Sequence, residues 1–328
     1  MSITKKRVAV LRGGPSNEYD ISLKTGASVL KHLPEKYEGI DVLIDKQGVW
    51  HIDGVPFHPK DFHLRADVAF NAMHGEYGED GTVQRILEMW SIPYTGSKSL
   101  ASGIGMNKAL SKEIFKQFNI KTPIHKVLKK DEVNNIEEEA RNLFMTFTQP
   151  SVVKPVNAGS SIGVSMVRSI KDMVLALENA FSISNTILIE EFIKGKEITC
   201  GVLEKFRNKE HYSLLPVEIV PRQDHTFFDY ESKYNNETIA LELCPANIRR
   251  ADSEEVQRIA VEAHKAIGAR HYSRIDFILS PKRGAYVLEI NTLPGLTDAS
   301  LLPKELTAIG SSYGELLEHL IELAQEKK

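Results

Sequence analysis

The first hundred residues alternate between short apolar runs and amphipathic segments. RVAVL, from Arg7 to Leu11, predicts a buried strand that ends at Gly13 and Gly14, and residues 22–33 predict the helix that follows. ADVAFNAMHG predicts a second strand, TVQRILEMW a second helix, and IPYTG a short strand that leaves this region. Strand, glycine turn and helix in this order are typical of a parallel α/β unit.

The pattern changes twice further along the chain. Apolar residues at helical spacing predict a helix over residues 106–118, and KTPIHKVL, an acidic helix over 135–147, SVVKP and GVSMV then suggest a small α+β unit. Strand patterns follow in TILIEEFI, KEITCGVLE and SLLPVEIV, and then comes a helix with Val256 and Ile259 on its apolar face. SRIDFILS and AYVLEINT predict a hairpin, and GELLEHLIELAQEKK predicts a closing helix. We therefore expect three α/β and α+β lobes in series, with bounds 1–96, 97–187 and 188–328.

Composition narrows the class of protein. The chain has 328 residues, of which 42% are apolar and 26% charged, which is normal for a soluble globular protein. A formal net charge of −3 gives no reason to expect a nucleic-acid partner. Cys200 and Cys244 are the two cysteines, and this scarcity favours a reducing cytoplasm over a single disulfide. No apolar run is long enough for a signal peptide or a membrane span, so we expect a cytosolic protein with no membrane partner.

The predicted hairpin near the carboxyl end carries the first candidate chemistry. Because alternate residues of a strand face one way, Arg274 and Asp276 share a face, as do Glu289 and Asn291. If the two strands pair antiparallel, two carboxylates and an amide oxygen meet beside an arginine. These hard oxygen ligands suit Mg²⁺ that also binds substrate phosphates. The alternative is the polar face of an edge strand, and the apolar flanks favour the metal site.

A lysine at the mouth of a loop of small residues is the second candidate. In VVKPVNAGSSIGVSMV, Lys154 precedes GSSIG, whose backbone amides can wrap a terminal phosphate. This loop is either a flap that closes over a nucleotide or a surface hairpin whose lysine stays solvated.

Two further segments carry weaker signals. In ILIEEFIKGKE, Glu190 and Glu191 end an apolar strand and Glu197 follows one short loop later, which suggests an adenine and ribose site or solvated glutamates. FFDYESKYNNET contains Lys233 and Tyr234, and is either a lid that carries a cation to the phosphates or a loop that covers the core.

Several blocks together resemble one family. GGPSNEYDIS, HGEYGEDGTVQ, IPYTGS, MNKALSK, VVKPVNAGSSIGV, FFDYESKY, RIDFIL and EINTLPGLTDASLLP are similar to the signature blocks of D-alanine–D-alanine ligases, members of the ATP-grasp superfamily. The blocks occur in family order over nearly the whole chain. The resemblance implies a three-lobed ATP-grasp fold with an N-terminal parallel α/β domain, and ATP held between the last two lobes.

The resemblance also assigns ATP and metal contacts. It implies that the ATP phosphates bind three lysines: Lys108, Lys154 and Lys233. It implies that the adenine site is lined by four consecutive residues, Glu190, Glu191, Phe192 and Ile193, and that Glu197 binds the ribose. Two Mg²⁺ ions, or Mn²⁺ in their place, would be held by Asp276, Glu289 and Asn291.

The remaining assignments concern two D-alanine molecules. The resemblance implies that the first D-alanine binds near Glu18, His74, Ser300 and Leu301, and that Arg274, Ser300 and the Gly295 backbone bind the second. Glu18, Ser160 and Tyr234 would form a hydrogen-bonded set. Taken alone, His74 suits a loop cap, Glu18 a charge at a helix N-terminus and Ser300 a helix N-cap or turn residue.

The implied reaction is ATP-dependent formation of D-alanyl-D-alanine through a D-alanyl phosphate, for peptidoglycan synthesis. An alternative is an ATP-grasp ligase with another second substrate, such as D-serine, D-lactate or another amino acid. A different class of function is a nucleotide-binding module that has lost turnover. The family also implies a homodimer, for which the sequence itself carries no signal.

Overall fold

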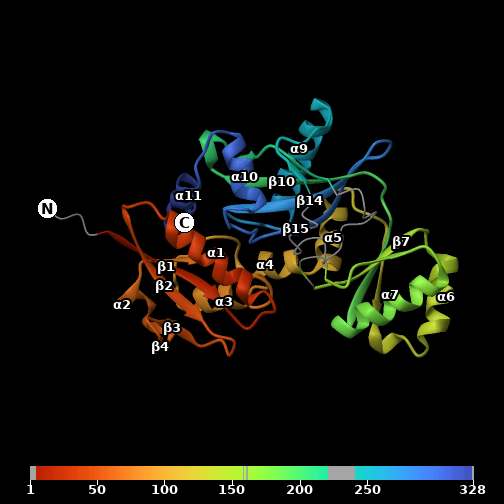
Figure 1. Cartoon of the computed structure of the whole chain (residues 1–328), viewed down its shortest axis with the longest axis horizontal. Helices are drawn as coiled ribbons and strands as arrows, with labels where there is room; N and C mark the ends of the chain where they lie inside the picture. The colour runs from red at the N-terminus through yellow and green to blue at the C-terminus, as the bar shows by residue number, and fades with distance from the viewer. Residues whose placement is uncertain (1–4, 158, 160–161, 221–240, 327–328) are drawn as a thin grey trace.

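The computed structural model of the chain describes residues 5–157, 159, 162–220 and 241–326, and these residues form three β-sheets (Figure 1). An N-terminal lobe and a central lobe lie at opposite ends of the long axis, and the strands β10, β14 and β15 lie between them. The order of the three sheets along the chain follows the order of the predicted units.

The N-terminal sheet has the order β4-β3-β2-β1-β5. Its strands are β1 (Lys6–Gly13), β2 (Tyr37–Ile44), β3 (Trp50–Ile52), β4 (Val55–Phe57) and β5 (Val68–Asn71). The strand β1 pairs parallel with both β2 and β5, while β3 and β4 add an antiparallel hairpin. The helices of this lobe are α1 (Tyr19–His32), α2 (Phe62–Arg65) and α3 (Thr82–Met89). The predicted parallel α/β unit is therefore confirmed.

The central lobe is an antiparallel sheet with two helices packed against it. Its strand order is β6-β9-β7-β8, with β6 (His125–Lys129), β7 (Ser151–Pro155), β8 (Ser165–Val167) and β9 (Thr186–Glu191). The helices α6 (Ile136–Thr146) and α7 (Ile170–Ile183) bury Leu143 and Leu177 against the sheet, in a core that this lobe has to itself. The strand β9 crosses the predicted boundary at residue 187, so that boundary remains a prediction.

The third sheet has the order β13-β12-β10-β14-β15, and β11 also pairs with β10. Its strands are β10 (Lys196–Glu204), β11 (His211–Ser213), β12 (Val217–Val220), β13 (Leu241–Leu243), β14 (Tyr272–Ser280) and β15 (Gly284–Asn291). Among the described residues, five helices accompany it: α4 (Ser99–Met106), α5 (Lys108–Gln117), α9 (Arg250–Ala266), α10 (Leu301–Ala308) and α11 (Tyr313–Gln325).

The N-terminal sheet and the C-terminal helices share one hydrophobic core. Val8 and Phe70 of the first sheet belong to the same buried cluster as Leu306 of α10 and Leu320 of α11. The end of the chain therefore packs back against its beginning, and these two regions form one body. The central lobe has a separate core.

Three predicted elements are corrected by the structure. The helix predicted over 106–118 begins later, at Lys108 of α5, because Asn107 has extended backbone and its side chain accepts a hydrogen bond from the Leu110 N–H (3.0 Å) as the N-cap of α5. SLLPVEIV is not one strand, because β11 ends at Ser213 and β12 begins at Val217. IPYTG forms an isolated bridge between Tyr94 and Ala69 in place of a strand.

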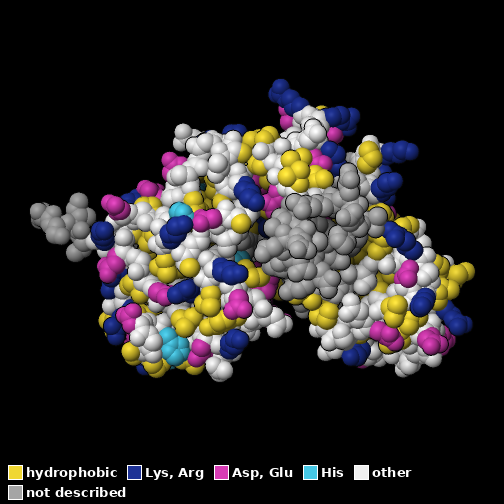
Figure 2. Space-filling model, in the orientation of Figure 1, with side chains coloured by type: hydrophobic (Ala, Val, Ile, Leu, Met, Phe, Trp, Pro, Cys, Tyr) yellow, Lys and Arg dark blue, Asp and Glu magenta, His cyan; other side chains and the backbone are white. Residues whose placement is uncertain are grey.

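Two expectations from composition can be compared with the structure. Cys200 is buried and Cys244 is half-buried, and both are free thiols. Among the described residues, no helix combines the length and the apolar character needed to cross a bilayer. On the face drawn in Figure 2, basic and acidic side chains are interspersed over the N-terminal and central lobes.

Candidate active site

The β14–β15 hairpin brings the predicted acidic residues together. The two strands pair antiparallel with Asp276 opposite Glu289 and Arg274 opposite Asn291, as the alternation of side chains predicts. The register shifts directly after Asp276, which marks a bulge at the site itself. Two carboxylates and an amide from neighbouring strands therefore share one face.

Asp276 is the centre of this hydrogen-bond network. Arg274 donates two parallel hydrogen bonds to it, from Nε to Oδ1 and from Nη2 to Oδ2, each 2.9 Å long. Thr199 of β10 donates to Oδ1 (2.7 Å) and the Asn291 side-chain amide donates to Oδ2 (3.1 Å). Since its NH₂ group is used on Asp276, the Asn291 amide presents its oxygen as the atom suited to a cation.

Burial and neighbouring charges shift the pKa of Arg274 in opposite directions. Burial disfavours its charge, but the adjacent Asp276 carboxylate, with a further contribution from Glu289, outweighs burial, and the pKa of the guanidinium is raised. Arg274 thus stays charged and is held in a fixed orientation by Asp276.

The break at Asn107 positions a lysine over the hairpin. Lys108 is the first residue of α5, and its Nζ lies 3.0 Å from Glu289 Oε2. The two side chains line a small cavity together with residues from four segments: Glu79, Gly105, Met106, Gly159, Ile290, Asn291 and Thr292. This cavity connects the predicted metal ligands with the N-terminal lobe and with the loop after Lys154.

The second predicted lysine belongs to a buried ion-pair network. Glu190 at the end of β9 lies between Lys154 Nζ (2.7 Å) and Lys112 Nζ (2.8 Å), and Glu190 and Lys112 are both almost completely buried. Burial raises the pKa of Glu190, but the two ammonium charges outweigh burial and the net shift is downward. Burial lowers the pKa of Lys112 to about 8 despite Glu190. Lys154 is therefore not the solvated surface lysine of the alternative prediction.

The segment predicted to hold the nucleotide base joins the central and third sheets. Glu191 is buried; its carboxylate accepts hydrogen bonds from Arg283 (2.9 and 3.2 Å) and from the Ile124 N–H (3.1 Å). Phe192 and the buried Ile193 connect β9 to β10, and Glu197 is the second residue of β10. Because Glu190 and Glu191 are buried and ion-paired, the solvated-glutamate alternative is wrong for these two residues.

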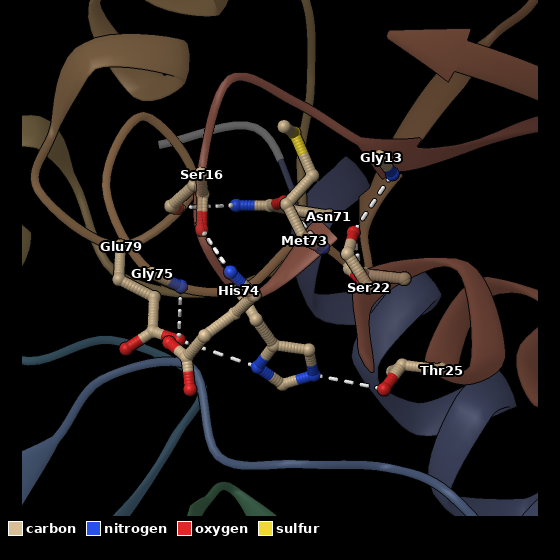
Figure 3. Close-up of polar contacts among 12 residues, drawn as sticks. Gly13, Ser16, Ser22, Thr25, Asn71, Met73, His74, Gly75 and Glu79 are labelled. Carbon is tan, nitrogen blue, oxygen red and sulfur yellow. Dashed lines mark hydrogen bonds and ion pairs between the residues drawn. The ribbon is translucent and has the colours of Figure 1, made fainter. Parts of the chain in front are cut away.

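His74 lies in a hydrogen-bonded position at the edge of the N-terminal sheet (Figure 3). Its Nε2 is 2.8 Å from Thr25 Oγ1 of α1, and its Nδ1 is 3.2 Å from Glu79 Oε1. Glu79 also accepts a hydrogen bond from the Gly75 N–H (2.9 Å). These contacts fix the imidazole ring of a residue that is 7% exposed.

Glu18 lies beside the loop that carries His74 and Gly75. A Cβ atom on Gly75 would lie 2.9 Å from Glu18 Oε2, and one on Gly159 would lie 3.4 Å from it. The Glu18 carboxylate therefore lies between the loop after β5 and the loop after Lys154. Gly75 also has a φ of +71°, so a side chain is excluded there by conformation as well as by space.

The loop before α10 closes the site from the other side. Ser300 does not cap α10 with its side chain; its Oγ accepts a hydrogen bond from the Thr297 N–H (3.0 Å) and lies 2.8 Å from Thr297 Oγ1. A Cβ on Gly295 would lie 3.0 Å from Ser300 Oγ and 3.9 Å from His74 Cε1. Leu301, half-buried, is the first residue of α10. The structure thus brings Gly295 and Ser300 next to His74.

Three predicted site residues, Ser160, Lys233 and Tyr234, lie outside the described residues. Other residues in the described part of the chain were not predicted: Lys112, Thr199 and Glu79. Lys112 is in the block MNKALSK, one helical turn after Lys108. Thr199 lies two residues after Glu197 on β10, so the two side chains face the same side of the sheet. Spacing from known candidates is therefore the signal that could have found these two.

Family models and curated relatives match nearly the whole chain. Residues 114–322 match the family described as D-ala D-ala ligase C-terminus, and residues 7–61 and 54–97 match D-ala D-ala ligase N-terminus. A D-alanine–D-alanine ligase from Geotalea uraniireducens is 36% identical over 98% of this chain and 96% of its own length. One from Desulfotalea psychrophila is 39% identical over 98% of this chain and 95% of its own length.

Solved structures are similar over the same extent. A D-Ala:D-Ser ligase from Enterococcus faecalis superposes with a TM-score of 0.85 at 29% identity, covering 98% of this chain and 100% of that one. A D-alanine–D-alanine ligase from Bacillus anthracis complexed with ATP has a TM-score of 0.76 at 32% identity, covering 97% and 96%.

The fold and the acidic hairpin beneath a lysine define an ATP-grasp ligase. More narrowly, the chain belongs to the D-alanine–D-alanine ligase family. The expectations of the family, the fold class and an ATP-dependent ligase are confirmed.

Proposed function

We propose that the protein joins two molecules of D-alanine into D-alanyl-D-alanine, with conversion of ATP to ADP and phosphate. The observation that carries the proposal is the register of the β14–β15 hairpin, which sets Asp276 opposite Glu289 with Lys108 above them. The family relatives support the choice of substrates, and the product would serve peptidoglycan synthesis in the cytosol. A homodimer is part of the proposal on family grounds alone.

The hairpin residues fit divalent cations. Asp276 and Glu289 offer carboxylate oxygens on adjacent strands, and Asn291 offers its amide oxygen, which are the donors that Mg²⁺ or Mn²⁺ prefers. Bound there, two such ions would neutralise charge on the phosphates of ATP. Asp276 and Glu289 now pair with Arg274 and Lys108, so these cations take the place of some of that positive charge.

The first step activates a carboxylate. The carboxylate of the first D-alanine attacks the γ-phosphorus of ATP, which gives an acyl phosphate and ADP. Lys108 and Lys154 enter from two different lobes and would stabilise charge on the transferring phosphoryl group. Glu18, which lies between the loop after β5 and the loop after Lys154, would bind the ammonium group of this D-alanine, and the fixed His74 ring would line its pocket.

The second step forms the peptide bond. The amine of the second D-alanine attacks the acyl phosphate carbonyl, a tetrahedral intermediate forms, and inorganic phosphate leaves. Arg274, held by Asp276, would bind the carboxylate of the second D-alanine and stabilise the oxyanion. Gly295 leaves its backbone accessible beside Ser300, where a side chain would block the approach of substrate.

A product assay tests the proposal directly. The protein is incubated with ATP, Mg²⁺ and D-alanine, and the product is identified by mass; we expect the D-alanyl-D-alanine dipeptide and one ADP for each dipeptide. Glu289→Ala should release no phosphate above background while its unfolding curve remains cooperative, because Glu289 is a half-buried ligand residue and not part of the core. Turnover at the wild-type rate in this variant would contradict the metal assignment.

A second candidate is a ligase that uses D-serine as the second substrate. This candidate is supported by the structural similarity of the chain to the Enterococcus faecalis D-Ala:D-Ser ligase. Competition between equal concentrations of D-alanine and D-serine, with D-lactate as a third candidate, distinguishes the two functions by the mass of the main product. We expect the D-alanine dipeptide to predominate.

A further inference from the structure

A second cluster of chemically active side chains lies away from the hairpin cluster. Glu204 is the last residue of β10, His211 is the first of β11 and lies opposite Glu204 in the sheet, and His264 is in the last turn of α9. One ligand atom from each of these residues lies within 4.8 Å of the other two. None of them has a role in the proposed ligase reaction.

His264 has a buried nitrogen that makes no hydrogen bond and lies near Glu204 in this cluster. Its side chain is completely buried, and among the described residues its Nε2 has no hydrogen-bond partner. Its other nitrogen, Nδ1, is 2.7 Å from Ser273 Oγ. Nε2 lies 3.6 Å from Glu204 Oε1, an ion-pair contact that is too long for a hydrogen bond. When Nδ1 donates to the serine, Nε2 carries a lone pair that a cation between it and Glu204 can accept. A buried polar atom that makes no hydrogen bond requires an explanation, because the missing hydrogen bond costs free energy.

The other two residues are held in compatible positions. The second oxygen of Glu204, Oε2, accepts a hydrogen bond from the His271 N–H (2.6 Å), which fixes the carboxylate and leaves Oε1 toward His264. The His211 ring is half-buried and lies edge-on to the His264 ring, with centroids 5.6 Å apart. His211 therefore provides the solvent-accessible side of the cluster.

We propose that Glu204, His211 and His264 bind a divalent transition-metal ion, of which Zn²⁺ is the best match. Two imidazole nitrogens and one carboxylate oxygen suit Zn²⁺, whereas Mg²⁺ prefers oxygen ligands. His264 is hydrogen-bonded to Ser273 and Glu204 accepts a hydrogen bond from the His271 N–H, and second-sphere hydrogen bonds of this kind orient zinc ligands. A water molecule completes a tetrahedral site on the His211 side.

The geometry needs only a small adjustment. Ligand atoms around a tetrahedral Zn²⁺ lie about 3.4 Å apart, close to the 3.6 Å between His264 and Glu204. Rotation of the half-exposed His211 ring would bring one of its nitrogens, the third ligand atom, to the same distance from the other two. The partial negative charge at the carboxyl-terminal end of α9 favours a bound cation, and so does the negative charge of Glu210. The positive charge of Lys265, in the last turn of α9, disfavours it.

The ion would act as a structural clamp. It would connect α9 to the β10–β11 hairpin at the end of the third sheet, on elements whose positions also set that of β14. Because no ligand residue touches the proposed substrate site, we expect ligase activity to persist without the ion. The inference is independent of the proposed function.

Zinc binding by the metal-free full-length protein tests this inference. The protein is stripped with EDTA, exchanged into buffer with excess Mg²⁺ to occupy the hairpin site, and titrated with Zn²⁺ by calorimetry. We expect His211→Gln to bind one equivalent of Zn²⁺ fewer than the wild type, and to fold normally because its ring is half-exposed. His63→Gln, which changes an exposed histidine of α2, is the matched control and should retain wild-type stoichiometry.

The visible absorption of bound Co²⁺ is a second measurement. It depends on metal coordination, so a variant that only perturbed the fold near His211 would not change it. We expect the visible absorption of tetrahedral Co²⁺ in the wild type and in His63→Gln, and its loss in His211→Gln. Equal Zn²⁺ stoichiometry in wild type and His211→Gln, or no Zn²⁺ binding by the wild type, would overturn the proposal. Zinc should likewise raise the melting temperature of the wild type and leave that of His211→Gln unchanged.

Discussion

Arg274 is held in one orientation by Asp276, and the proposed mechanism gives it a role in binding substrate. Its fork is used on Asp276 from within the same strand, so its direction is set before any substrate binds. A lysine carries the same charge but offers a point contact in place of a planar pair of donors. The position therefore tests whether shape, beyond charge, matters at this site.

Arg274→Lys should lower kcat/KM for D-alanine by about 10²- to 10³-fold, the range found when one oxyanion donor is lost. Steady-state phosphate release with D-alanine as the varied substrate measures this. Arg258→Lys is the matched control, since Arg258 makes an exposed pair with Glu262 on α9. An Arg274→Lys variant as active as this control would remove Arg274 from the mechanism.

Glu305 is a second residue whose chemistry depends on its surroundings. It is completely buried in α10; one oxygen accepts a hydrogen bond from the Gly201 N–H (2.8 Å), and the other has no partner among the described residues. Burial raises the pKa of this carboxyl well above its ordinary value of 4.5. The folded protein therefore retains a proton that the unfolded chain has already lost.

This difference in protonation predicts a pH dependence of stability. Since the folded state binds more protons, the free energy of unfolding falls as the pH rises from about 4.5 through the folded pKa. Glu305→Gln has no such proton to lose. Denaturant unfolding should show the variant more stable than the wild type at pH 9, with the difference shrinking toward pH 5. A difference that stays constant or grows on acidification would contradict the assignment.

At the residue scale, alternation along two strands was sufficient to predict the acidic face. The register confirms that Asp276 and Glu289 are opposite each other. The partners of these residues could not be predicted in the same way. Lys108 and Thr199 reach the hairpin from α5 and β10, and only the packing of those elements brings them there.

The connection among α5, β7 and β9 is the main feature at the scale of elements. Lys112, Lys154 and Glu190 come from these three elements and meet in a buried network. Removing one member of a buried network leaves charge without compensation, which costs about 3–5 kcal/mol. The network therefore holds the central sheet against α5, beside the proposed nucleotide site.

Glu190→Gln should lower the free energy of unfolding by about 3–5 kcal/mol, because it leaves two buried lysines without a counter-charge. Urea unfolding followed by circular dichroism measures the change. Glu113→Gln, which removes an exposed carboxylate of α5, the helix that carries Lys112, should change it by less than about 1 kcal/mol. If the two variants were equally stable, the network would not connect these elements.

The sequence predicted most elements but not all of their ends. The predicted helix over 106–118 corresponds to α5, which begins at Lys108, and the separate helix α4 before it was not predicted. Asn107 is a good N-cap residue and was the available signal for the break. The break matters, because it places Lys108 at the start of α5, next to Glu289.

At the scale of the whole molecule, the N-terminal and C-terminal regions act as one body and the central lobe as another. The shared core of β1, β5, α10 and α11 unites the first, while the central sheet has its own. Local patterns predict that a helix has an apolar face but not which sheet that face covers, so the sequence could not predict this core. The proposed reaction site lies where the two bodies meet.

The central claim is that this junction transfers phosphate from ATP to the carboxylate of D-alanine. Oxygen tracing tests it most directly: D-alanine labelled with ¹⁸O in its carboxylate is supplied with ATP and Mg²⁺, and the released phosphate is analysed by mass. The account predicts one ¹⁸O atom in each phosphate and one dipeptide for each phosphate. Phosphate that carries oxygen from solvent in place of the label would show that water attacks ATP, and would contradict the account.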